Sequence, residues 1–149
     1  MENKSHEDAI ELLKGDHAQV KAAFKEFDAL GSKAYAAKKK LADSICSDLV
    51  KHTLIEEEIF YPAVQNGSKE AKDLIDEALV EHASAKELIA QIQAMAPEDD
   101  LFDARVKVLS EQIEHHVKEE EEEMFPLAKK MKLNLVNLGE QMAARKIQL

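Results

Sequence analysis

Two eleven-residue stretches, "HTLIEEEIFYP" at residues 52–62 and "HVKEEEEEMFP" at residues 116–126, share one order. Each begins with a histidine, continues into a run of glutamates and ends in an aromatic residue followed by proline. A glutamate, Glu56 or Glu120, stands four residues after each histidine. Residues four apart lie on the same face of a helix. Each stretch therefore predicts a helix that presents an imidazole and a carboxylate in the same direction.

The two stretches are the second parts of a longer internal repeat. "DHAQVKAAF" at residues 16–24 resembles "EHASAKELI" at residues 81–89, upstream of each stretch. The repeated histidines are 35 residues apart in the first half and 34 apart in the second half. Two copies of a helix-loop-helix unit predict a bundle with pseudo-two-fold symmetry, in which matching positions meet near the centre.

The composition of the chain favours helices over strands. Its 149 residues include 4 glycines and 3 prolines, and Ala, Leu, Glu and Lys are abundant. Apolar residues recur at spacings of three and four in four long stretches, at residues 5–30, 34–60, 69–95 and 101–125. We therefore predict an all-α fold, an antiparallel up-down-up-down four-helix bundle. One domain spans residues 1–149, with the bundle at about 5–126 and a short extra C-terminal helix at about 133–146.

Charge and hydropathy exclude several classes of partner. The chain has 20 basic and 30 acidic residues, a net charge of −10, which opposes binding to nucleic acid phosphates. We find no apolar run near the length of a membrane span and no signal peptide in "MENKSHEDAI". These features predict a cytoplasmic protein. A single cysteine, Cys46, excludes an internal disulfide, and its apolar neighbours predict a place in the core.

Four histidines lie in line with the apolar stripes of the four predicted helices. With the two glutamates, six polar groups point into one interior, and burying them unpaired would cost several kcal/mol per charge. A pair of metal ions removes this conflict, because imidazoles and bridging carboxylates are ligands for iron, manganese or zinc. The predicted ligands are His17, His52, Glu56, His82, His116 and Glu120.

Other polar and aromatic residues near these motifs have simpler interpretations. Most of the remaining glutamates in the two runs are predicted to be solvated, as is His115, and His6 precedes the bundle. Tyr61 is predicted to pack at the bundle end, with a hydrogen-bonding role near the site as the alternative. Pro62 and Pro126 are interpreted as helix terminators or kinks. The glutamates predicted to be on the surface are Glu57, Glu58, Glu119, Glu121 and Glu122.

Together these motifs resemble the hemerythrin-like domains, also called HHE cation-binding domains. The matching features are Asp16-His17, the two His-x-x-x-Glu blocks, Glu81-His82 and the tail "LGEQMAARK" at residues 138–146. The resemblance implies a four-helix bundle around a non-heme di-iron centre with an oxo or hydroxo bridge. It assigns ligand roles to the same six residues. It also implies that zinc or manganese can take the place of iron.

The chain departs from the oxygen-carrying members of that family in the third helix. Those proteins have two histidines one turn apart, whereas Ala78 and Lys86 stand one turn on either side of His82. Each of two irons has about six coordination positions. With the six ligand residues and the oxygen bridge in place, about two of these positions stay open, one more than in the five-histidine arrangement. Solvent or a nearby side chain fills the extra position; the candidates are Glu57, Glu81, Lys86 and Tyr61.

The leading functional hypothesis is a non-heme di-iron protein that binds O2 or a related small oxidant. An oxidoreductase acting on peroxide or NO is the main alternative, and the additional open position favours it. An iron-handling or iron- or oxygen-sensing module and a metal-stabilised helical module without redox chemistry are further alternatives. Whether the protein is an enzyme stays open at this point.

Overall fold

In the computed structural model, residues 7–149 are described. The predicted start of the first helix at Ser5, and His6, lie outside this range. Every element within the range is helical, which confirms the predicted all-α fold. The elements are α1 (Ala9–Ala29), α2 (Tyr35–Ile55), η2 (Glu56–Phe60), α3 (Tyr61–Gln65), α4 (Lys69–Ala94), α5 (Phe102–Glu119), η3 (Glu120–Met124), α6 (Phe125–Lys129) and α7 (Leu135–Gln148).

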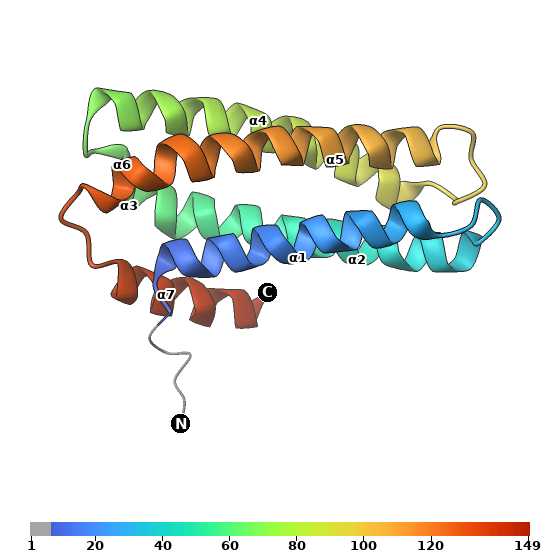
Figure 1. The fold of residues 1–149 in the computed structure, drawn as a ribbon, viewed down its shortest axis with the longest axis horizontal. Helices are drawn as coiled ribbons and strands as arrows, with labels where there is room; N and C mark the ends of the chain where they lie inside the picture. Colours follow the sequence, from blue (N-terminus) through green and yellow to red (C-terminus); the bar gives the residue numbers. More distant parts are fainter. Residues whose placement is uncertain (1–6) are drawn as a thin grey trace.

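The four long helices α1, α2, α4 and α5 form the predicted antiparallel bundle (Figure 1). α3 and α6 extend α2 and α5 at one end, and α7 lies on the outside of the bundle at that same end. Local sequence sets the helix starts. Asp8 and Glu11 form a reciprocal capping box before α1, and the Ser68 side chain accepts a hydrogen bond from the Ala71 backbone at the start of α4.

The two glutamate-rich stretches each contain one wider helical turn. η2 and η3 are π-helical, and the backbone N–H of Tyr61 donates to Glu56 O, five residues earlier. The N–H of Phe125 donates to Glu120 O in the same way. A proline ring clashes with the carbonyl four residues before it in a regular α-helix, and a wider turn relieves that clash. Pro62 and Pro126 therefore change the winding of the helix. Of the two interpretations, terminator or kink, the terminator is wrong, because the helix continues beyond both prolines.

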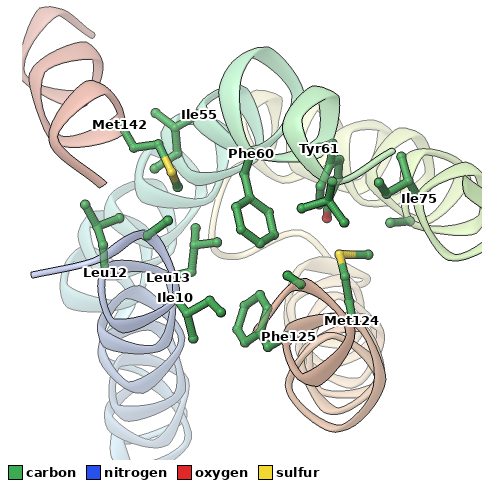
Figure 2. Packing of buried hydrophobic residues seen from close by; sticks show 14 of the residues in the cluster. Ile10, Leu12, Leu13, Ile55, Phe60, Tyr61, Ile75, Met124, Phe125 and Met142 are labelled. Carbon is green, nitrogen blue, oxygen red and sulfur yellow. The ribbon is translucent and has the colours of Figure 1, made fainter. Parts of the chain in front are cut away.

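The apolar core is divided into two clusters along the bundle axis. One fills the end near α3, α6 and α7, where Phe60 and Phe125 meet edge to face with ring centroids 5.8 Å apart (Figure 2). The other fills the opposite end, and Cys46 lies in it with 1% of its surface exposed, as predicted. A layer of buried polar side chains lies between the two clusters. Apolar packing on both sides therefore holds this polar layer in place.

The C-terminal helix α7 is tied to the bundle by packing and by charge. Met142 is fully buried in the first core cluster. A Cβ atom on Gly139 would lie 2.6 Å from the backbone oxygen of Glu7, so only glycine allows this close approach. Arg145 pairs with Glu58 at 2.7 Å. None of the helices in residues 7–149 is long and apolar enough to cross a membrane.

Candidate metal centre

The structure brings all six predicted ligand residues together in the polar layer. One histidine comes from each of the four long helices, and the two glutamates are the first residues of η2 and η3. None of the six is more than 7% exposed, and Glu56 is fully buried. Their side chains form two overlapping groups that could hold metal ions. The first contains His17, His52, Glu56 and Glu120, and the second contains Glu56, His82 and His116.

The Glu120 carboxylate reaches both groups with different oxygens. Its Oε1 lies 3.1 Å from His17 Nε2, and its Oε2 lies 3.2 Å from His116 Nε2. Glu56 Oε1 lies 3.4 Å from His52 Nε2 and 3.1 Å from His82 Nε2. Each carboxylate is thus placed between a histidine of the first half of the chain and a histidine of the second half. Both carboxylates therefore lie where they could bind a cation together with the histidines.

Several of these buried atoms have no hydrogen-bond partner within residues 7–149. They are His17 Nε2, His52 Nε2, Glu56 Oε2 and Glu120 Oε1. His17 Nε2 and Glu120 Oε1 are close, but their geometry does not satisfy a hydrogen bond between them. Leaving buried polar atoms unpaired is costly. The donor set, nitrogen and carboxylate oxygen facing a shared interior, fits a metal cation.

Each inward histidine is held from outside by a second carboxylate on its Nδ1 atom. His17 Nδ1 lies 2.7 Å from Glu121, and His52 Nδ1 lies 2.9 Å from Asp16. Such contacts fix the ring and direct the opposite nitrogen, Nε2, inward. The remaining pairs are His82 with Glu57 and His116 with Glu81, each at 2.7 Å.

These outer contacts correct part of the sequence interpretation. Glu57, Glu119 and Glu121 are only partly exposed, so the prediction that they are surface residues is confirmed only in part. Glu57 and Glu121 each hold a histidine. The signal in the sequence was their position directly after Glu56 and Glu120, but spacing alone did not show which neighbouring helix they face. The prediction is confirmed for Glu58 and Glu122, which are exposed.

Two lysines support the outer carboxylates. Lys146 of α7 lies 2.5 Å from Asp16, which in turn contacts His52. Lys86 contacts both oxygens of Glu57 at 3.0 Å. Lys86 is therefore engaged away from the polar layer. The C-terminal helix is linked to the centre through Lys146 and Asp16.

Neighbouring carboxylates control the protonation of the buried imidazoles in the metal-free protein. Burial alone would lower the pKa of His52, but the charge of Glu56 and the hydrogen bond to Asp16 outweigh it and raise the pKa to about 10. Burial likewise opposes protonation of His116, and Glu120 and Glu81 outweigh it and raise that pKa to about 11. Protons therefore balance the buried carboxylates when no cation does. A metal ion that binds Nε2 must displace them.

Tyr61 is a further polar member of the buried layer. Its hydroxyl donates its one proton to Glu120 Oε2, 2.5 Å away, and the hydroxyl oxygen also lies 3.2 Å from Glu56 Oε1. The same oxygen lies 3.3 Å from His82 Nε2 and 3.5 Å from His116 Nε2. The alternative interpretation of Tyr61, a hydrogen-bonding neighbour of the site, is therefore confirmed, and its ring also packs in the first core cluster as predicted. Burial, together with the charges of Glu56 and Glu120, raises the pKa of the phenol well above its usual value.

The π turn explains why Tyr61 points inward. In a regular helix, a residue five after Glu56 would lie on another face, whereas the wider turn rotates it onto the face of Glu56. The matching residue in the second half is Phe125, whose ring stacks on His17 with a centroid distance of 5.9 Å. One half of the layer thus gains a phenol oxygen and the other an apolar ring.

A cavity of about 60 Å³ adjoins the polar layer. All four inward histidines line it, together with apolar side chains such as Val20, and Lys146 lies on its wall. This volume exceeds the space that one water needs. The cavity therefore has room for a small molecule beside the histidines.

The fold and the buried cluster define a class, the helical bundles that hold metal cations on histidine and glutamate side chains. The chain belongs to the hemerythrin HHE cation-binding domain family, whose sequence model matches residues 8–128. A solved structure of a hemerythrin HHE cation-binding domain-containing protein from Mycobacterium kansasii is similar, with a TM-score of 0.80 and 26% identity. The similarity covers 95% of this chain and 86% of that one.

A curated relative carries a different kind of name. A protein of Nostoc sp. named DNA nickase is 30% identical over an alignment of 117 residues, and the match covers 77% of this chain. The match spans only 32% of that relative's length. Its name therefore describes a much longer protein than the segment that resembles this chain.

Proposed function

We propose that this protein is a non-heme di-iron protein that binds O2 or a related small oxidant. The observation that carries the proposal is the Glu120 carboxylate, whose two oxygens face histidines from opposite halves of the repeat. Bound iron supplies the redox chemistry toward the oxidant. The residues that would hold the two ions are His17, His52, Glu56, His82, His116 and Glu120. Glu56 belongs to both groups of ligand atoms, and Glu120 lies beside a histidine of each.

The protein's own residues would position the metals and exclude water. The four outer carboxylates fix the imidazole rings, so little reorganisation accompanies metal binding. The two apolar clusters close the layer from both ends of the bundle. The cavity lined by the four histidines offers space for a molecule of only a few atoms. These features support a small oxidant over a larger organic substrate.

Tyr61 is the proposed occupant of the additional coordination position. The sequence leaves one position more than a five-histidine centre, and the Tyr61 oxygen lies within 3.5 Å of both His82 Nε2 and His116 Nε2. Among the four candidates, Glu57 and Glu81 contact Nδ1 atoms on the outside, and Lys86 contacts Glu57. Only the Tyr61 hydroxyl lies among the inward-facing atoms.

The same tyrosine favours a second candidate function, an oxidoreductase acting on peroxide or NO. In this second candidate the hydroxyl stays off the metal: cleavage of peroxide and reduction of NO both move protons to oxygen atoms at the site, and a phenol among the ligand atoms is placed to donate one. Nicking of DNA is not part of either proposal, because the net charge of −10 opposes phosphate binding.

Metal analysis with optical spectroscopy tests the proposal. Protein grown with iron should carry close to two irons per chain, and its spectrum should differ between anaerobic and aerobic solutions. Glu120→Ala should lose the dinuclear centre, whereas Glu122→Ala, on the exposed side of the same turn, should keep it. One iron or none in the iron-grown parent protein would contradict the proposal.

Peroxide assays separate the two candidate functions. A binding protein should show an oxygenated spectrum that decays slowly and little release of O2 from peroxide. An enzyme should release O2 from peroxide catalytically, and Tyr61→Phe should slow that turnover while two irons remain bound.

A further inference from the structure

A second cluster of metal-ligand side chains lies on the surface between α4 and α5. His115 Nε2 is 3.7 Å from a carboxylate oxygen of Glu81 and 3.7 Å from one of Glu119. The three ligand atoms lie within 4.8 Å of one another. The His115 side chain is 66% exposed, as predicted for a solvated residue, while Glu81 and Glu119 are half-buried. One imidazole and two carboxylates from two packed helices can bind one cation together.

Glu81 connects this surface cluster to the buried layer. Its Oε1 contacts His116 Nδ1 at 2.7 Å, and its Oε2 faces His115. The carboxylate thus lies between two histidines, of which one faces solvent and the other faces inward. Glu119 directly precedes Glu120 in the chain.

A small cavity provides a second, independent link between the two clusters. Its volume is about 10 Å³, the space of about one water. Glu81 and Glu119 of the surface cluster line it, and so do His116 and Glu120 of the buried layer. Residues of both clusters therefore border the same small space.

We propose that Glu81, His115 and Glu119 bind a divalent transition-metal cation at an outer site on the surface. We further propose a loading role for this outer site, in which the buried centre receives its metal ions from it. The loading role rests on the proposed function above, whereas the cation site itself does not. Imidazole nitrogen with carboxylate oxygen suits Fe²⁺, Mn²⁺ and Zn²⁺, with water completing the coordination. Exposure makes the site weak and exchangeable, as a transfer site must be.

Zinc titration of protein whose buried centre is already filled with iron tests the outer site. Calorimetry should detect one additional, weaker Zn²⁺ per chain, and the side-chain NMR signals of His115 should shift with the same saturation curve. His115→Ala and Glu119→Gln should weaken this binding at least about tenfold, since loss of a supporting contact alone costs that much. Glu114→Gln is the matched control, because Glu114 is exposed on α5 and outside the cluster.

Absence of the additional Zn²⁺ in the parent protein would overturn the outer site. Equal zinc affinities in Glu119→Gln and Glu114→Gln would overturn it as well.

Iron uptake tests the loading role. Metal-free protein is mixed anaerobically with Fe²⁺, uptake is stopped with a chelator at intervals, and retained iron is counted. His115→Ala and Glu119→Gln should fill more slowly than the parent and Glu114→Gln, yet reach the same final content. Equal uptake rates in all four proteins would overturn the loading role. Protein that binds Zn²⁺ at His115 but never retains iron would contradict the proposed function and leave the outer site standing.

Discussion

At the scale of single residues, the centre depends on which nitrogen each histidine turns inward. Asp16, Glu57, Glu81 and Glu121 contact the Nδ1 atoms, and the Nε2 atoms face the layer. A hydrogen bond on one ring nitrogen sets the role of the other. Four separate outer carboxylates thus produce one common inner arrangement.

The first prediction concerns the pH dependence of the metal-free protein. The pKa of His52 is about 10 in the folded state and 6.5 when exposed. Its contribution to stability is therefore fully present below pH 6.5 and is lost as the pH rises through 10. Urea unfolding of chelated protein should show decreasing stability over that range, and His116 adds to the effect up to about pH 11.

A pair of variants checks which group causes this decrease of stability with rising pH. His52→Asn should flatten the decrease, while His115→Asn should leave it unchanged, because His115 is exposed. An identical slope in His52→Asn and the parent would show that the buried imidazole is not protonated as described.

The second prediction concerns the Tyr61 hydroxyl. In metal-free protein it donates to the buried Glu120 carboxylate, and a hydrogen bond to a charged group contributes about 1.5–3 kcal/mol. Tyr61→Phe should therefore lower the free energy of unfolding by about that amount in a urea titration. Tyr35→Phe is the matched control, since Tyr35 is exposed, and should change little. Equal effects of the two substitutions would contradict the described role of Tyr61.

The inward residues could be predicted from the sequence because each obeys a simple spacing. His52 and Glu56 are one regular turn apart, and so are His116 and Glu120, so helical periodicity was sufficient. The outer carboxylates could not be assigned in this way. Whether Glu57 reaches His82 depends on how two helices pack, and a period within one helix does not contain that information.

At the scale of elements, the two π turns decide what surrounds the ligands. Each begins at a ligand glutamate and precedes a proline by two residues. Prediction with a constant 3.6-residue period placed Glu56 correctly, because the wider turn begins there. The same period does not extend to Tyr61, which comes after the extra residue of the wider turn. Proline signalled an irregularity, but not that the helix would widen and continue.

The third prediction concerns the attachment of α7. Gly139→Ala would place a Cβ 2.6 Å from the Glu7 backbone oxygen, which no rotamer change relieves. It should destabilise the protein by about 1–3 kcal/mol, the range for overpacking. Gly15→Ala is the control, because a Cβ there meets nothing within 4 Å in an exposed part of α1. It should stabilise the protein by roughly 0.5–1 kcal/mol.

Thermal unfolding of both alanine variants in the same buffer measures this contrast. Destabilisation by Gly15→Ala, or no loss in Gly139→Ala, would contradict the described packing of α7.

At the scale of the whole molecule, the bundle is a repeat whose halves match in ligands but differ in surroundings. Each half supplies two histidines and one glutamate to the polar layer. Tyr61 borders His82 and His116, whereas the matching Phe125 stacks on His17. Lys146 of α7 reaches the layer only through Asp16 and His52. Two metal ions in this layer would therefore have different environments.

The fourth prediction couples metal to the stability of the fold. A cation that binds the folded chain alone stabilises it by about 4 kcal/mol at a thousandfold excess over its dissociation constant. Metal-loaded protein should melt roughly 10 °C above chelated protein. Glu120→Ala should show a much smaller difference. Equal melting temperatures for loaded and chelated parent protein would contradict a buried metal centre.

Anomalous X-ray diffraction from crystals of iron-loaded protein, recorded on both sides of the iron absorption edge, locates each bound iron and tests whether the polar layer holds two. We predict two iron peaks in the polar layer, one bound by His17 and His52 and the other by His82 and His116. Both should contact Glu56 and Glu120, with the Tyr61 oxygen at the second. A single peak in that layer, or iron found only outside it, would contradict the account.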